Sequence, residues 1–363
     1  MKLTLLTLAL LVAIAQAAPL EARAKKTSPA KKPKAKSSAK SSKATTVPTI
    51  STGYTSSPSV NTGSSGSSSG LITEACNIGY ATLNGGTTGG GSASTTTVTS
   101  LAELTACATK AGPAVCLIKG AITGNTAIKV TADTTIAGAA GSSLTGVGFR
   151  VFKVKNVILR NLKISKVLAS AGDAIGIQKA SNVWVDHCDL SSDQDHGKDY
   201  YDGLCDITHA SDYITVSNTY LHDHYKASLV GHSDNNGAED TGHLIVTYAN
   251  NFFENLNSRG PSVRFGTAHI YNHYAKTAST GVNTRIGAQL LIESSVFEGV
   301  PMAIQSAYSK SVGYATVKDV DLGTGTNTVK ASTLTSVPYK YTLLGSEKVA
   351  SAVTATAGQT LKF

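Results

Sequence analysis

Short, apolar strand signals recur along this chain, and their spacing is the feature that most restricts its fold. Each signal spans four or five residues, is rich in β-branched side chains and alternates in polarity; the clearest are residues 157–161, 183–187, 214–218, 245–248, 269–272 and 290–293. They recur at intervals of about 21 to 33 residues, and the extra length lies in Gly-, Ser- and Asp-rich inserts such as 193–203 and 233–242. Helical periodicity is scarce between them.

This repeat predicts a solenoid. The interval is too short for strand–helix–strand units and too irregular for a propeller, so each turn must bury its apolar side by stacking on its neighbours. A β-sandwich would also have short alternating strands, but at intervals of about 8 to 12 residues and joined by hairpins. Asn161, Asn218 and Asn272 end three of the strands. We expect them to form a polar ladder that binds bend carbonyls inside the coil.

The first 70 residues differ in composition from the rest. Residues 1–18 begin with Met-Lys, continue with an apolar run and end in small side chains, a pattern that predicts a secretory signal peptide. Residues 19–70 are rich in Lys, Ser, Thr, Ala, Pro and Gly, which predicts a disordered linker. The net charge of +9 resides almost wholly in this linker, where nine Lys and Arg face one Glu. Residues 71–363 remain as one elongated, nearly neutral domain.

These features bear on location and partners. No later stretch reaches the roughly 18 to 20 apolar residues of a membrane helix, so we expect a secreted, extracellular monomer without membrane association after signal cleavage. The basic linker is interpreted as a solvated spacer or pro-segment, with attraction to an acidic wall polymer as the alternative. Binding of nucleic acid conflicts with export, and we expect none.

The five cysteines permit disulfides in an exported protein. Cys107 and Cys116 would close a short loop, whereas Cys188 and Cys205 would cross-link neighbouring turns and leave Cys76 unpaired. Other pairings are compatible with the sequence. No CxxC spacing indicates zinc.

Acidic residues gather in the middle of the predicted solenoid. Asp173 follows Gly172, and Asp202 and Asp206 lie four residues apart in one strand and its approach. Carboxylate oxygens from separate turns suit calcium, which tolerates irregular geometry. Capping of turns is the alternative role for an isolated aspartate.

Basic residues follow in the next turns. Lys226 comes first, and Arg259 and Arg264 flank a rigid Gly-Pro pair beside a strand. Two arginines five residues apart are often surface ion-pair formers, each worth about 1 kcal/mol or less. Their position beside the acidic turns favours a functional role.

Together, several of these segments resemble the pectate lyase family. The resemblance lies in residues 182–187, in Arg259-x-Pro261-x-x-Arg264, and in the following Phe-Gly-x-x-His-x-Tyr-Asn at 265–272. It covers about residues 79–299, including the Gly- and Thr-rich run 84–90. It implies an all-β, right-handed parallel β-helix with a groove beside the strands that carry these motifs.

The resemblance also implies roles for individual residues. Arg259 matches the family's catalytic base, and Lys226 and Arg264 match residues that bind substrate carboxylates. Asp173, Asp202 and Asp206 match the ligands of Ca²⁺. Some relatives have another acidic residue where Ala171 stands, which implies weaker calcium binding in this chain. The segment 182–187 and the sequence His-Asp-His at 222–224 are assigned to structure and groove lining.

The implied reaction is calcium-assisted β-elimination of polygalacturonate, the acidic polymer of de-esterified pectin, to give 4,5-unsaturated ends. An arginine base implies an alkaline optimum, because its pKa normally exceeds about 12. Three alternative functions would require different residues. A calcium-independent pectin lyase would lack the acidic ligands, a polygalacturonase would need carboxylates on both sides of the bond, and a non-catalytic carbohydrate-binding β-helix would not need Arg259 together with the calcium set.

Overall fold

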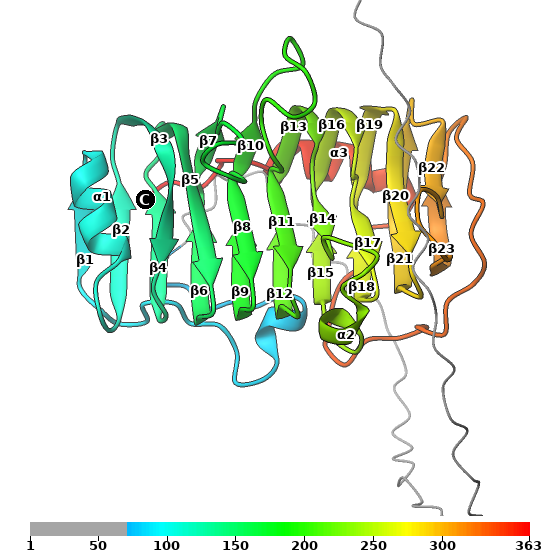
Figure 1. Cartoon of the computed structure of the whole chain (residues 1–363), viewed down its shortest axis with the longest axis horizontal. Helices are drawn as coiled ribbons and strands as arrows, with labels where there is room; N and C mark the ends of the chain where they lie inside the picture. The colour runs from blue at the N-terminus through cyan, green and yellow to red at the C-terminus, as the bar shows by residue number, and fades with distance from the viewer. Residues whose placement is uncertain (1–70) are drawn as a thin grey trace, which may run out of the picture. The chain divides into compact units, whose positions relative to one another are not determined.

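The structure, a computed structural model, describes residues 71–363 (Figure 1). The predicted signal peptide (1–18) and linker (19–70) lie outside the described residues. Residues 71–363 form a coil in which strands from successive turns stack side by side, and every ladder between the strands is parallel. The predicted parallel β-helix is therefore confirmed. Within this part of the chain, no helix is long and apolar enough to cross a membrane.

Three stacks of strands form the walls of the coil. The stack with most of the candidate residues, here the site face, comprises parts of β3 (Ala121–Val130) and β5 (Ser143–Phe152), and β8 (Ile175–Gln178), β11 (Cys205–Thr208), β14 (Leu229–Val230), β17 (Ser262–Arg264), β20 (Thr280–Arg285) and β22 (Met302–Gln305). The second stack, the covered face, comprises β1 (Thr95–Val98), β2 (Ala114–Ile118), β4 (Thr134–Gly138), β6 (Lys155–Arg160), β9 (Ser181–Asp186), β12 (Asp212–Ser217), β15 (Ile245–Ala249), β18 (Thr267–Tyr271), β21 (Gln289–Glu298) and β23 (Tyr314–Asp321). The third stack comprises the remaining part of β5, β7 (Lys163–Ser165), β10 (Asp189–Ser191), β13 (Tyr220–Lys226), β16 (Phe252–Ser258), β19 (Tyr274–Ala278) and part of β21.

Strand alternation explains the core. In the covered face, Leu159 aligns with inward-facing residues of the next strands, which are Val185, Val216, Tyr248, Ile270 and Ile292. All six side chains are fully buried. Because a strand directs alternate side chains to opposite sides, a shift of one residue would turn this entire row away from the core. The hydrophobic pattern therefore sets the register of the coil.

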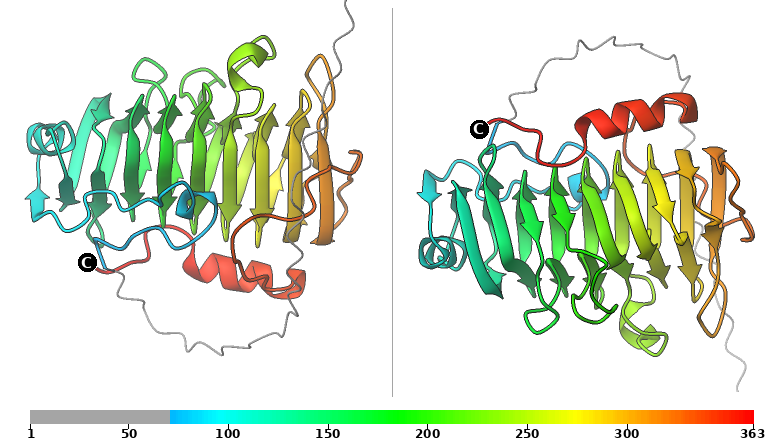
Figure 2. Two further views of the ribbon diagram at one scale, coloured as in Figure 1. Left: turned by 90° about the horizontal axis from the view of Figure 1, so that it is seen from below. Right: turned by 90° about the horizontal axis from the view of Figure 1, so that it is seen from above.

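The outward side of the covered face is buried as well. Trp184 projects from it and is only 2% exposed, since residues 71–94 cross these strands. Figure 2 shows this segment, in blue, lying along the coil. The backbone N–H groups of Tyr80 and Ala81 donate to the hydroxyls of Thr247 and Thr215, each at 3.0 Å. These contacts explain why polar threonines are buried in the middle of apolar strands.

The strand-ending asparagines make corners. Asn161, Asn218 and Asn272 all have positive φ, between 47° and 55°, a conformation that asparagine tolerates better than most residues. The polar ladder inside the coil lies one residue later than predicted: Asn251 Oδ1 accepts from the N–H of Thr219 at 2.9 Å. The side chain of Asn161 instead donates to the carbonyls of Gly138 and Leu361. That of Asn272 donates to Asn250 Oδ1 and to the carbonyl of Thr342.

A few helical segments complete the fold. The first is α1 (Leu101–Ala108), which packs at the β1–β2 end. It is tied to β2 by the disulfide between Cys107 and Cys116, one of the pairings compatible with the sequence. The suggested bond between Cys188 and Cys205 is wrong: both thiols are free and fully buried in the apolar core. The other short elements are a 3-10 turn (Tyr80–Thr82), α2 (Gly237–Asp240) and α3 (Ser346–Thr356).

Candidate active site

The three predicted metal-ligand aspartates meet at the site face. Asp173 lies just before β8, Asp202 lies just before β11, and Asp206 stands on β11. These two strands are neighbours, with Gly176 of β8 paired to Asp206. Asp173 and Asp202 line one cavity of about 160 Å³. The coil therefore brings together carboxylates that are about 30 residues apart in sequence.

These carboxylates carry more negative charge than their surroundings neutralise. Burial raises the pKa of Asp173 well above its usual range, and the charges of Asp206 and Asp202 raise it further. Burial also raises the pKa of Asp206 to about 6, although Arg259 opposes this rise. Backbone N–H groups donate to both residues at 2.9 Å. A bound cation would relieve the remaining repulsion.

Two predicted basic residues contact these carboxylates. Arg259 Nη1 lies 3.1 Å from Asp206 Oδ2, although the residues are 53 positions apart. Lys226 Nζ lies 3.4 Å from Asp202 Oδ1 and 3.2 Å from Asp199 Oδ1. Arg259 adopts a positive φ of 65°, which directs its side chain toward β11 at the cost of local backbone strain.

Arg264 is oriented by a partner that the sequence did not reveal. Its Nε donates to Asp234 Oδ1 at 2.6 Å, and its Nη1 donates to the carbonyl of Gly231 at 2.9 Å. Asp234 also accepts from the hydroxyl of Ser309 and the N–H of Lys310. Partial burial raises the pKa of Asp234, but these partners outweigh it and hold the pKa at about 2. Asp234 therefore remains ionised and holds the Arg264 side chain in a fixed orientation.

Arg285 is a further basic residue of the site that the sequence motifs did not indicate. It stands on β20 directly opposite Arg264 of β17 in the strand register. Burial, together with the charges of Arg264 and Arg259, lowers the pKa of Arg285 to about 10. Its Nε is buried without a hydrogen-bond partner in the described part of the chain. The site face thus changes from acidic at β8 and β11 to basic at β17 and β20.

His224 supports the acidic turn as a neutral group. Its Nε2 lies 2.6 Å from the carbonyl of Asp202, which can only accept, so Nε2 carries the proton. Its Nδ1 contacts the hydroxyl of Ser192. Burial, aided by Lys226 and Arg259, lowers the pKa of His224 to about 4. These contacts hold His224 against the carbonyl of Asp202. That residues 222–224 line the groove stays a prediction.

The motif at 182–187 lies on the covered face, away from these residues. Asp186 is fully buried and accepts from Arg160 Nε at 3.0 Å and from the hydroxyl of Ser217. Arg160 lies over the Trp184 ring and also pairs with Glu74 of the crossing segment. The motif therefore fastens residues 71–94 to the coil, as its structural assignment implies.

The carboxylates of Asp173, Asp202 and Asp206 are suited to a hard cation, although their oxygens do not converge on one point. Within residues 71–363, no group of three or more His, Cys, Asp and Glu is arranged to hold a metal ion. Asp202 instead faces Lys226, and Asp206 faces Arg259. The donors are all carboxylate oxygens, as calcium prefers. Gly203 also keeps space beside them: a Cβ there would lie 2.4 Å from Asp206 Oδ1.

The fold and this charge pattern define a parallel β-helix protein with carboxylates and basic side chains on neighbouring strands of one face. Comparison with known proteins narrows the class. Residues 39–361 match the family described as pectate lyase. Pectate lyase B of Colletotrichum gloeosporioides is 63% identical over 294 residues, which cover 80% of this chain and 88% of that protein. Pectate lyase plyB of Emericella nidulans is 57% identical, covering 79% and 90%.

Solved structures agree. A pectate lyase from a Bacillus species, determined in complex with trigalacturonate, superimposes with a TM-score of 0.71 at 29% identity, covering 79% of this chain and 99% of that one. A pectate lyase variant from Xanthomonas campestris gives 0.67 at 28% identity, covering 78% and 98%. This chain belongs to the pectate lyase family and is a polysaccharide lyase.

Proposed function

We propose that this chain is an extracellular pectate lyase that cleaves polygalacturonate by calcium-assisted β-elimination. The observation that carries the proposal is the change of charge along the site face, from Asp173 and Asp206 to Arg259, Arg264 and Arg285. A polyuronate presents a carboxylate on each sugar. Along this face it would meet groups suited to hold a cation and, within a few turns, groups suited to bind carboxylates directly.

The residues divide the chemistry between them. A calcium ion held by Asp173, Asp202 and Asp206 would neutralise the C6 carboxylate and so make the C5 proton more acidic. Arg259, in its neutral form, takes the C5 proton. The electron pair of the C5–H bond forms the C4–C5 double bond as the bond between C4 and the glycosidic oxygen breaks, and a proton from water neutralises the departing oxygen.

Stabilisation of the developing charge falls to Lys226 and Arg264. Both are only 11–15% exposed and both are already oriented by aspartates, so little reorganisation accompanies substrate binding. Arg264 still has unused donors, because its bonds to Asp234 and Gly231 occupy Nε and one N–H of Nη1. Lys226 and Arg264 therefore bind the uronate carboxylate more strongly as charge accumulates on it.

Export and chain organisation form part of the same proposal. The composition of residues 1–18 supports a signal peptide, and that of residues 19–70 supports a basic linker ahead of the domain. A polymeric substrate of the plant cell wall requires an enzyme outside the cell. The domain acts as a monomer in this proposal.

The test is to add the purified protein to polygalacturonate and follow the ultraviolet absorbance of the unsaturated product. We expect absorbance that grows with calcium, stops with excess chelator, increases above neutral pH and disappears in Arg259→Ala. Equal activity in chelator would indicate pectin lyase chemistry instead. No absorbance on either pectate or esterified pectin would indicate a hydrolase or a binding protein.

A further inference from the structure

Three cations surround one aromatic ring at the N-terminal side of the site face. Arg150 Cζ lies 4.8 Å from the centroid of the Phe152 ring, Lys153 Nζ lies 5.1 Å from it, and Lys129 Nζ lies 5.4 Å from it. The three cationic residues are exposed, and Phe152 is half-buried. We call these four residues the Phe152 cluster. Neither the proposed mechanism nor the family motifs involve any of them.

The Phe152 cluster lacks a negative partner within the chain. Among residues 71–363, no ion pair involves Lys129, Arg150 or Lys153; Arg150 donates instead to the neutral amide of Gln178 at 2.7 Å. Attraction to the ring face gathers the cations, but their mutual repulsion remains. An anion placed among them would remove that repulsion.

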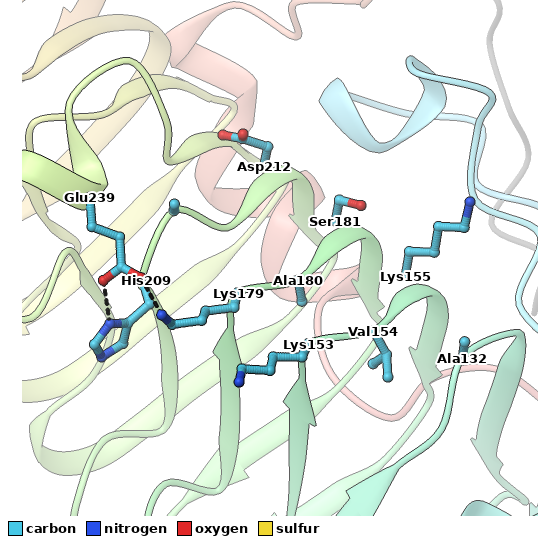
Figure 3. A pocket seen from close by; sticks show the side chains of 11 residues that line it. Ala132, Lys153, Val154, Lys155, Lys179, Ala180, Ser181, His209, Asp212 and Glu239 are labelled. Atoms are coloured by element: carbon cyan, nitrogen blue, oxygen red, sulfur yellow. Dashed lines mark hydrogen bonds and ion pairs between the residues drawn. The ribbon is translucent and has the colours of Figure 1, made fainter.

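The equivalent lysine of the next turn, Lys179, does have a negative partner. Lys179 follows β8 as Lys153 follows β5, and both line a second cavity of about 570 Å³ at the other edge of the site face (Figure 3). In that cavity Lys179 lies 2.5 Å from Glu239, which also binds His209. Figure 3 shows a dashed line that joins Lys179 to Glu239, whereas no such line reaches Lys153. Lys153 and Lys179 thus occupy equivalent positions after neighbouring strands, but of these two only Lys179 has a carboxylate partner among residues 71–363.

The cluster is continuous with the active site. Arg150 pairs with Gly176 on the next strand, and Gly176 pairs with Asp206. Two strand spacings, about 10 Å, therefore separate Arg150 from Asp206 along one outward row. Gly176 has no side chain, and the Asp173 carboxylate lies beside it, where a Cβ would meet Asp173 Oδ2 at 3.0 Å. The cavity that Asp173 and Asp202 line extends to Arg150 and Gln178.

We propose that the Phe152 cluster is a distal subsite that binds a carboxylate of an acidic polysaccharide chain extending from the reaction centre toward β5 and β3. The inference rests on the proposed function and deepens it. A sugar bound over the aspartates lies within two turns of Arg150, so the next sugars of a long substrate reach the cations, whereas a short substrate does not. Arg150 supplies the paired N–H donors that suit a carboxylate, and the two lysines supply charge.

The experiment compares Lys129→Gln/Arg150→Gln with the wild type and with Lys110→Gln, which removes an exposed lysine beside α1, away from the site face. Calorimetry measures the dissociation constant for hexagalacturonate in the Arg259→Ala background with calcium present. Steady-state assays measure KM on polygalacturonate and on trigalacturonate.

We expect binding of hexagalacturonate to weaken about 10-fold in the double variant, with a similar increase in KM on polygalacturonate. KM on trigalacturonate and all values for Lys110→Gln should match the wild type. Equal binding by the double variant and Lys110→Gln would overturn the inference, as would an equal loss on short and long substrates. If the wild type forms no unsaturated product, the proposed function fails, and the calorimetric comparison still decides the subsite.

Discussion

Asparagine in place of Asp206 should stabilise the calcium-free protein while it abolishes catalysis. Burial raises the pKa of Asp206 from 3.8 to about 6 despite the ion pair with Arg259. A difference of one in pKa corresponds to about 1.4 kcal/mol, so ionisation of Asp206 should destabilise the fold by about 3 kcal/mol. Asp206→Asn removes that charge and retains an oxygen that can accept from the N–H of Leu229.

The sign follows from proton binding. Between pH 4 and 6 the folded protein holds the Asp206 proton more tightly than the unfolded chain does, so the wild type loses stability as pH rises through this range. Asp206→Asn and the wild type should unfold at the same urea concentration below about pH 4. Above pH 6, in chelator, the variant should be more stable by about 3 kcal/mol. Calcium should stabilise only the wild type and so reduce the difference.

Asp189→Asn is a matched variant that should have the opposite effect on stability. Burial raises the pKa of Asp189 too, but His222 and Lys163 outweigh it and lower the pKa. Asp189→Asn should therefore be less stable than the wild type at neutral pH. The reasoning about Asp206 would be refuted if Asp206→Asn unfolded at the same or a lower urea concentration than the wild type at pH 7 in chelator.

Three further changes test the fold and the site. Replacing Cys107 and Cys116 by serine opens a loop with a sequence separation of 9, and urea unfolding should show a loss of about 2 to 3 kcal/mol; an unchanged midpoint would contradict this. Gly203→Ala places a Cβ 2.4 Å from a ligand oxygen on β11 and should lower the lyase rate about 100-fold, whereas Gly197→Ala, in open space in the same loop, should keep it. His273 is fully buried with neither ring nitrogen hydrogen-bonded in the described part of the chain, so His273→Leu should raise stability by about 1 kcal/mol; a lower melting temperature would count against it.

Local patterns were sufficient to predict the solenoid and much of the site. Alternating strands at a 21- to 33-residue interval can bury their apolar side only by stacking, and the inward row that begins at Leu159 bears this out. The bond between Cys107 and Cys116 was one of several pairings that the sequence allowed. Arg259 and Arg264 could be singled out because a rigid Gly-Pro pair and a family motif mark them.

Other features depend on which residues the stacking aligns. Arg285 and Asp234 lie in ordinary sequence surroundings, and they join the site because β20 pairs with β17 and the insert before β15 returns to Arg264. The interior position of Cys188 and Cys205, which leaves both as thiols, is likewise invisible in their spacing.

The difference between features that the sequence predicts and features that only the folded coil reveals has a physical reason. Strand alternation, turn residues and short loops act between neighbours in the chain, so the sequence by itself determines that this protein coils and where each turn bends. Contacts across turns, such as Arg259 with Asp206 or Arg150 with the cavity at Asp173, join residues whose separation varies with the length of every insert between them. Only the register of the folded coil decides which charges meet, because a shift of one residue reverses the direction of every side chain in a strand.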